Sequence, residues 1–432
     1  MPLPGQPPDA PRPLRVRLHG WRHPAILSAA FVSMAAGFAQ FGATAALGDV
    51  AAAFGELGEG TTIADQVALS GTTLGVGLAV IRLASVASLP LAGLADRRGR
   101  RSVLIGCCAG GLALTAAAAL SPSFWWLVAV FALGRPLLSA TNAVAGVVAA
   151  EETRSADRAK AIALITAGYG TGAGLTALVR GVGGGQVGFR LLFALALVPL
   201  ALLPFAGRLL EEPDRYARLR APAGDASLRP RLGHVAPLLR PRLVLLAALT
   251  FAIAFVTGPV NAFLFVYAEG VVGLTPASTA LVVLAAAPVG LAGLLTGRWA
   301  ADRFGRRRTA GLAHVAVAVG GAVTYTSGVT GAVAGYLLGA IFAASAYAPS
   351  AGALGTEVFP TSVRATAAGW LTVAGVLGAV AGLLAFGLVA DAFGSFGPAA
   401  VAVAAPVALA AVGYAGLPET RGLELEESAP ES

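Results

Sequence analysis

Asp96-Arg97-Arg98-Gly99-Arg100-Arg101 is a short charged segment in an otherwise apolar chain, and it recurs as Asp302-Arg303-Phe304-Gly305-Arg306-Arg307. The second copy follows the first by 206 residues, and Glu357 and Arg364 follow Glu151 and Arg158 by the same interval. Charged residues are rare between these landmarks, so chance does not account for the shared interval. The repeat predicts two homologous halves of about 200 residues each.

The residues between the charged segments are mostly Ala, Gly, Val and Leu. Charged residues make up 12% of the chain, compared with roughly 25% in soluble domains. A helix of about 20 apolar residues crosses the hydrocarbon core of a bilayer. Twelve such runs lie near residues 25–49, 66–91, 102–120, 124–150, 159–182, 190–207, 243–268, 277–297, 309–328, 332–356, 366–390 and 398–417. A soluble helical protein would need polar helix faces that these runs lack. We therefore expect an all-α integral membrane protein, with twelve transmembrane helices in two six-helix parallel repeats in the lipid bilayer.

The distribution of basic residues predicts the topology. If residue 1 is cytoplasmic, all but four of the 30 lysines and arginines fall in segments that are then cytoplasmic. The four exceptions are Arg82, Arg135, Arg180 and Arg190. The positive-inside rule therefore predicts a multi-pass protein of the cell membrane with both termini in the cytoplasm. The net charge of +8 then reflects topology, and nucleic acid is not expected as a partner.

The apolar runs and charged segments divide the chain into five parts. We expect a cytoplasmic tail over 1–24, a six-helix bundle over 25–207, a cytoplasmic linker over 208–242, a second bundle over 243–418 and a cytoplasmic tail over 419–432.

Residues that carry enzyme or metal chemistry are scarce. Cys107 and Cys108 are adjacent within one predicted span, which fits neither a disulfide framework nor metal-ligand spacing. His314 is alone in the ninth span, where a packed neutral imidazole is a simpler reading than a proton relay. No nucleophile–base signature or phosphate-binding glycine loop is visible in the sequence. We expect no enzymatic activity, no cofactor and no metal.

The repeated loops carry a family resemblance. Each Asp-Arg-x-Gly-Arg-Arg loop lies between the second and third spans of its half and resembles the signature loop of the major facilitator superfamily. The segment from Leu417 to Glu427 is similar to the ending of the sugar-porter branch of that superfamily, and the segment from Glu357 to Arg364 is similar to the branch's loop between spans 10 and 11. The resemblance covers residues 25–427 and implies the major facilitator fold and a secondary transporter that works by rocker-switch alternating access. Gln40 stands near the position where the branch has a proton-coupling aspartate.

The resemblance also implies a role for the charged clusters. In the superfamily they latch the cytoplasmic side while the cavity opens outward, and the alternative is positive-inside anchoring with helix capping. The gate residues expected on this basis are Asp96, Arg97, Arg100, Arg101, Glu151, Arg158, Asp302, Arg303, Arg306, Arg307, Glu357 and Arg364.

Two glycine pairs occupy corresponding spans, the fifth and the eleventh. They are Gly168-x-x-x-Gly172 and Gly378-x-x-x-Gly382, and Gly378 follows Gly172 by 206 residues. Small residues four apart allow close helix approach in lipid. One interpretation is that these glycines line the surface on which one half moves against the other. The alternative is a codon bias that places Ala and Gly throughout the chain.

Polar residues inside the spans are the candidates for solute binding. A charge at the bilayer centre costs at least about 2.5–3.5 kcal/mol, so it normally faces a cavity or a partner. Arg82 and Arg135 fall within spans 2 and 4, whereas the acids Asp49 and Glu269 fall at outer helix ends. The resemblance implies that Arg135 corresponds to a cavity arginine of the family. Arg180 lies near the outer end of span 5 and is given no role. The candidate binding residues are Gln40, Arg82, Arg135, Ser139, Asn142, Asn261, Ser345 and Tyr347.

Arginines without an obvious buried counter-ion favour an anionic partner. We expect a secondary transporter, by symport or uniport, of a small polar and anionic organic solute. A neutral polar solute remains an alternative, as does a cationic or apolar drug carried by a multidrug or toxic-compound exporter. A non-transporting membrane sensor on the same fold is a further alternative. Protons are a candidate coupling ion through Asp49 or Glu269, and we expect a monomer.

Overall fold

The computed structural model describes residues 19–183, 187–212 and 239–423. Within these residues, 12 helices are long and apolar enough to cross a membrane. They are Pro24–Ala45, Gly71–Arg98, Arg100–Leu120, Phe124–Glu152, Asp157–Val182, Phe189–Leu209, Arg240–Ala262, Pro276–Phe304, Arg306–Thr326, Gly328–Glu357, Thr366–Phe393 and Phe396–Gly416. The expected all-α membrane fold is confirmed. Most of the two predicted tails and of the linker lies outside the described residues.

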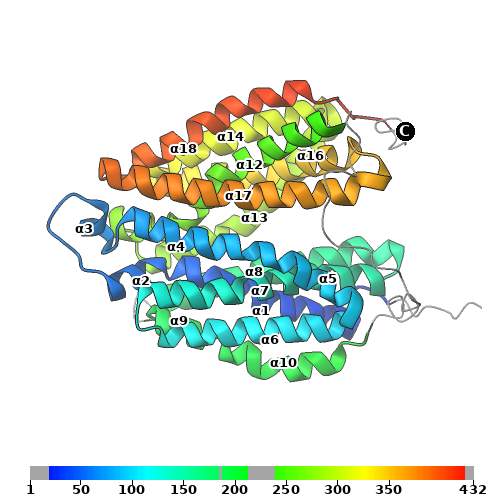
Figure 1. The fold of residues 1–432 in the computed structure, drawn as a ribbon, viewed down its shortest axis with the longest axis horizontal. Coiled ribbons are helices and arrows are strands. Elements are labelled where there is room, and N and C mark those ends of the chain that lie inside the picture. Colours follow the sequence, from blue (N-terminus) through cyan, green and yellow to red (C-terminus); the bar gives the residue numbers. More distant parts are fainter. Residues whose placement is uncertain (1–18, 184–186, 213–238, 424–432) are drawn as a thin grey trace, which may run out of the picture.

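The first six spans pack side by side as one bundle, and the last six form a second bundle beside it (Figure 1). The first bundle contains α1 (Pro24–Ala45), α4 (Gly71–Ala84), α5 (Ser88–Arg98), α6 (Arg100–Ala117), α7 (Phe124–Glu152), α8 (Ser155–Val182), α9 (Phe189–Ala194) and α10 (Leu197–Leu209). The second contains α12 (Arg240–Ala262), α13 (Pro276–Phe304), α14 (Arg306–Thr326), the π-helical segment Gly331–Ala343, α16 (Ala344–Glu357), α17 (Thr361–Phe393) and α18 (Phe396–Ala410). Short helices α2 (Leu47–Phe54) and α3 (Ile63–Val67) follow α1, and a π-helical turn η5 (Val266–Val271) follows α12.

The two charged loops lie at the same end of the bundles, because six spans separate them. We call this end, with residues 96–101 and 302–307, the signature-loop face, and the other end the opposite face. Gly99 ends α5 with φ 104°, and Gly305 ends α13 with φ 97°. A positive φ is readily adopted by glycine alone. Each glycine therefore lets one helix stop and the next begin without an intervening loop.

The paired glycines of spans 5 and 11 join helices of the same half. Gly172 on α8 lies directly against the main chain of Met34 on α1, and Gly382 on α17 lies against Phe255 on α12. The expectation that these glycines line the surface between moving halves is therefore wrong for this structure. The physical reason is that close main-chain packing fixes two helices together instead of leaving a surface that slides.

The contacts between the halves gather toward the opposite face. There α4 approaches α17 through Gly71 and Gly387, and α8 approaches α13 where Gly181 meets Ala280. The carboxylate of Asp391, near the end of α17, accepts hydrogen bonds from the backbone N–H of Gly71 (2.6 Å) and of Thr72 (2.8 Å). A carboxylate at a helix N-terminus is stabilised by the helix dipole. The opposite face is therefore closed by main-chain contacts and by charge.

Candidate functional site

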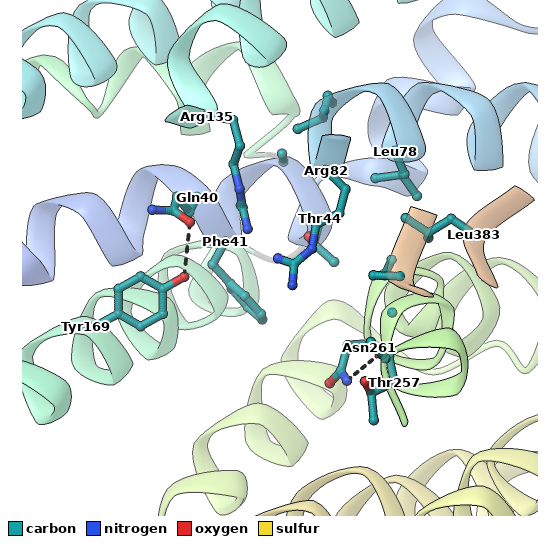
Figure 2. A pocket seen from close by; sticks show the side chains of 16 residues that line it. Gln40, Phe41, Thr44, Leu78, Arg82, Arg135, Tyr169, Thr257, Asn261 and Leu383 are labelled. Carbon is teal, nitrogen blue, oxygen red and sulfur yellow. Dashed lines mark hydrogen bonds between the residues drawn. The ribbon is translucent and has the colours of Figure 1, made fainter. Parts of the chain in front are cut away.

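A cavity of about 310 Å³ lies between the two halves (Figure 2). Its polar lining comes from α1, α4, α7 and α8 of the first half and from α12 of the second half. These residues are Gln40, Thr44, Arg82, Arg135, Tyr169, Thr257 and Asn261. Phe41, Leu78 and Leu383 are among its apolar lining residues. The volume falls at the lower end of the range typical of small-molecule sites, roughly 300–1,000 Å³.

Two arginines give this cavity its charge. Arg82 and Arg135 both direct their guanidinium groups into the cavity, and Arg82 points toward Thr257 and Asn261 (Figure 2). The Nε atom of each arginine is buried and has no hydrogen-bond partner. Among the described residues, neither arginine forms a salt bridge. An unpaired buried charge is unfavourable, so this cavity is complementary to a negative group.

Gln40 and Tyr169 form one wall of the cavity. The Tyr169 hydroxyl on α8 donates to Oε1 of Gln40 on α1 at 3.4 Å, so the two packed helices present one hydrogen-bonded pair (Figure 2). Sequence reasoning missed Tyr169. The available signal was a single tyrosine between Gly168 and Gly170 in a span that otherwise offers the cavity little polar surface.

Asn261 forms the facing wall in the second half. Its Nδ2 donates to the Thr257 carbonyl at 2.8 Å, and the Tyr336 hydroxyl donates to its Oδ1 at 3.4 Å. These two bonds fix the orientation of the amide and leave further donor and acceptor capacity free for a solute. Thr257, which lies one helical turn before Asn261, was also missed from the sequence.

Four of the predicted binding residues lie away from this cavity. Ser139 lines a separate cavity of about 110 Å³, which also contacts Arg82. Asn142 accepts a hydrogen bond from Ser33 at 2.7 Å, within the packing of α1 against α7. Ser345 lies against Gly290, between α16 and α13. Tyr347 accepts a hydrogen bond from Tyr414 at 2.8 Å inside the second half.

The signature-loop residues of the first half form a compact ionic cluster. Arg100 is 6% exposed. It pairs with Asp96 at 2.8 Å and with both carboxylate oxygens of Glu151 at 3.1 Å. Arg101 donates to the Gly207 carbonyl at 2.8 Å and 3.0 Å.

The second half repeats this arrangement with looser geometry. Arg306 pairs with Asp302 at 3.5 Å and with Glu357 at 3.5 Å. Arg307 donates to the carbonyls of Ala415 and Leu417. Each of these contacts between described residues joins residues of the same half.

The remaining gate candidates differ in their surroundings. Arg364 donates to the carbonyls of Thr356 (2.9 Å) and Phe359 (3.2 Å), which is a capping role at the end of α16. The Nε of Arg158 is buried without a hydrogen-bond partner. Arg97 and Arg303 are exposed on the signature-loop face.

Two glutamates that sequence reasoning left out of the site complete the clusters. Glu212 accepts hydrogen bonds from the backbone N–H groups of Arg100 and Arg101, and Glu419 accepts the equivalent pair from Arg306 (2.9 Å) and Arg307 (3.2 Å). Each carboxylate caps the N-terminus of the helix that follows a signature loop. The signal was the Glu-Pro and Pro-Glu pairs that follow the sixth and twelfth spans.

Arg180 has an acidic partner in each half of the protein, so the expectation that it has no role is wrong. It is 4% exposed. It pairs with Asp49 through two bonds of 2.8 Å and 2.9 Å and with Glu269 through one bond of 2.7 Å. The carboxylates that seemed to be separate helix-end acids converge on this arginine because α2 and η5 fold back over the end of α8.

The structure places a central cavity between two six-helix halves. The chain belongs to the major facilitator superfamily, because the profile of the Major Facilitator Superfamily matches residues 26–342. No curated protein sequence matches the chain.

Solved structures agree with this fold. The inward open structure of the xylose transporter XylE from E. coli has a TM-score of 0.74 and 19% sequence identity, and the match covers 93% of this chain and 98% of that one. The nucleoside transporter NupG has a TM-score of 0.70 and 14% identity, with 91% and 98% covered. An inward-facing bacterial homologue of the human lysosomal transporter Spinster has a TM-score of 0.67 and 17% identity, with 90% and 95% covered.

Proposed function

We propose that this transporter moves a small anionic organic solute by rocker-switch alternating access. The observation that carries the proposal is the pair of cavity arginines, Arg82 and Arg135, which have no acidic partner among the described residues. A carboxylate or a similar planar anion matches the guanidinium fork through two parallel hydrogen bonds. The solute then supplies the missing counter-charge when it binds.

The facing walls suggest how such a solute would lie. Its acidic group binds the arginines of the first half, and its other polar groups reach Thr257 and Asn261 of the second half (Figure 2). Phe41 and Leu383 contact its apolar part. A solute held by both halves responds to their relative motion, which is what alternating access requires.

The distribution of arginines supports one orientation in the membrane. We propose that the signature-loop face is cytoplasmic, because it carries most of the basic residues of the chain. The protein then resides in the cell membrane with both termini in the cytoplasm. Main-chain contacts close the opposite face, which in this orientation supports an inward-facing state. We further propose that in the outward-facing state the signature-loop clusters latch the cytoplasmic ends of the bundles.

Two rival functions make different demands on the cavity. A cavity that binds cationic drugs favours negative groups, whereas the two charged side chains that line this cavity are both arginines. A sensor without transport activity would show solute binding but no flux.

Substitution of Arg135 tests the proposal. The measurement is the dissociation constant of purified protein for a panel of organic acids, neutral sugars and cationic drugs, followed by flux of any ligand in proteoliposomes. We expect an organic acid to bind, and Arg135→Gln to weaken its binding roughly 10- to 150-fold, which corresponds to the loss of one charge-assisted hydrogen bond. Arg135→Lys recovers part of the affinity, because a single ammonium cannot reproduce the fork.

Arg190→Gln is the matched control. Arg190 lies outside the cavity and donates to the Ala119 carbonyl at 2.9 Å, so its loss should leave the dissociation constant unchanged. Wild-type affinity in Arg135→Gln and Arg82→Gln alike would refute the anion site. A lower melting temperature with unchanged affinity would assign Arg135 a structural role.

A further inference from the structure

The ionic cluster of Arg180, Asp49 and Glu269 joins the two halves at the opposite face. Arg180 and Asp49 belong to the first half, on α8 and α2, whereas Glu269 belongs to the second half, on η5. The Arg180–Asp49 contact is bidentate, and the Arg180–Glu269 bond of 2.7 Å crosses between the halves. The Arg180 side chain is 5% exposed and the Glu269 side chain 14%. Closing this face therefore removes most of both side chains from water.

The charges in this cluster do not balance. One guanidinium faces two carboxylates, so the closed cluster holds one surplus negative charge when both acids are ionised. Asp49 has the better geometry toward Arg180, with two bonds against one for Glu269. Burying a surplus charge is costly, and the surplus falls on Glu269.

Within the described part of the chain, the other elements packed against η5 supply no second cation. α3 contributes Asp65, whose carboxylate is held by the Thr62 backbone N–H (3.0 Å) and hydroxyl (2.6 Å) within its own capping box. α13 contributes the uncharged hydroxyl of Thr279. Among the described residues that face Glu269, Arg180 is the one positive group.

The pKa of Glu269 is shifted in the direction that the charge count requires. Burial is the largest cause and raises this pKa, Arg180 and Thr279 oppose the rise, and Asp49 adds to it. In a water-filled open face the pKa of Glu269 would return to its ordinary value. The closed state therefore binds a proton more tightly than the open state. By linkage, protonation favours closure below the ordinary pKa, and this preference is lost as pH rises through the raised pKa.

We propose that Glu269 takes up a proton as the opposite face closes and that it is a proton-binding site of this transporter. This inference rests on the alternating access proposed above. A neutral Glu269 still accepts the hydrogen bond from Arg180, while Arg180 and Asp49 remain paired as one cation and one anion. Protons on the opposite side of the membrane then promote the step that turns the cavity toward the signature-loop face. The site lies far along the chain from Gln40, whose amide does not titrate in this pH range.

Distance measurements between spin labels test the proposal without any solute. Leu120 and Val329 are exposed positions at the opposite face, one in each half, and can be replaced by labelled cysteines after Cys107→Ala and Cys108→Ala. In nanodiscs between pH 4.5 and 8.5, we expect the short-distance population of the otherwise wild-type protein to grow as pH falls. The closed-to-open ratio should change by about 10-fold for each unit by which the two pKa values differ.

Three variants separate the charge argument from general acid effects. Glu269→Gln mimics the protonated residue and should remain closed at every pH. Asp49→Asn removes the surplus charge and should also abolish the pH response, even if Glu269→Gln fails to fold. Asp65→Asn is the matched control and should titrate like the wild type.

The proposal is overturned if the wild-type distances are independent of pH, if they shorten as pH rises, or if Glu269→Gln keeps the full response. Solute binding by Arg135 is measured separately. A neutral or cationic solute would therefore contradict the proposed substrate class and leave this result standing.

Discussion

The ionic clusters at the signature-loop face predict unequal effects for the same substitution in the two halves. Arg100 is 6% exposed and holds Asp96, both oxygens of Glu151 and the Ala95 carbonyl at 2.8–3.1 Å. Removing one partner of a buried ion pair costs about 3–5 kcal/mol. Because the Glu151 side chain is 19% exposed and water reaches the carboxylate that is left behind, we expect Arg100→Gln to reduce the free energy of unfolding by about 2–4 kcal/mol.

The equivalent residue of the second half, Arg306, should matter less. Its ion pairs are both 3.5 Å long, and its side chain is 19% exposed. Exposed and poorly aligned pairs contribute about 0–1 kcal/mol, so Arg306→Gln should be close to neutral. Thermal unfolding of the two purified variants in the same detergent measures the difference. Equal losses, or a larger loss for Arg306→Gln, would refute the reasoning from geometry. An additive double variant is expected, because the ion pairs described for Arg100 and for Arg306 lie in different halves.

Two further substitutions test features of the fold. Gly99→Ala places a side chain at φ 104° against the Glu212 carboxylate and should cost about 1–3 kcal/mol in unfolding free energy, whereas Gly106→Ala, which meets no atom within 4 Å, should be neutral or slightly stabilising by the same thermal assay. Asp391→Asn weakens the cap on α4 by about 0.3–1 kcal/mol, so labels at Leu120 and Val329 should report a larger open population. An unchanged distance distribution would remove Asp391 from the closure of the opposite face.

The fold followed from the sequence because membrane insertion depends on local composition. Runs of about 20 apolar residues predict spans whatever their tertiary partners, and the spacing of Asp96 and Asp302 predicts the parallel repeat. Glu212 and Glu419 show the limit of that reasoning. Their motifs are visible, but only the structure places each carboxylate on the backbone of the signature loop of its own half, more than 100 residues earlier in the chain.

The site was less predictable, because it depends on the rotation of each helix about its axis. The structure directs Arg82, Arg135 and Asn261 into the main cavity, while Tyr347 faces the interior of its own bundle. All lie within predicted spans, where the sequence does not show which way each side chain points. The role of Arg180 was not predicted, because its acidic partners lie on a short helix and a turn that fold back across the end of α8. Such short segments have no hydrophobic periodicity from which their position could be inferred.

The main-chain packing of α1 on α8 and of α12 on α17 has a consequence for recognition. Helices in contact through Gly172 and Gly382 cannot separate without opening a gap, so each helix pair moves as one rigid body. Gln40 and Tyr169 belong to one pair, and Asn261 belongs to the other. The polar groups that each pair presents to a solute are then the same whichever side of the membrane the cavity faces, and only the distance between the two pairs changes. A solute long enough to reach both pairs is held most tightly midway through the cycle, when that distance is smallest.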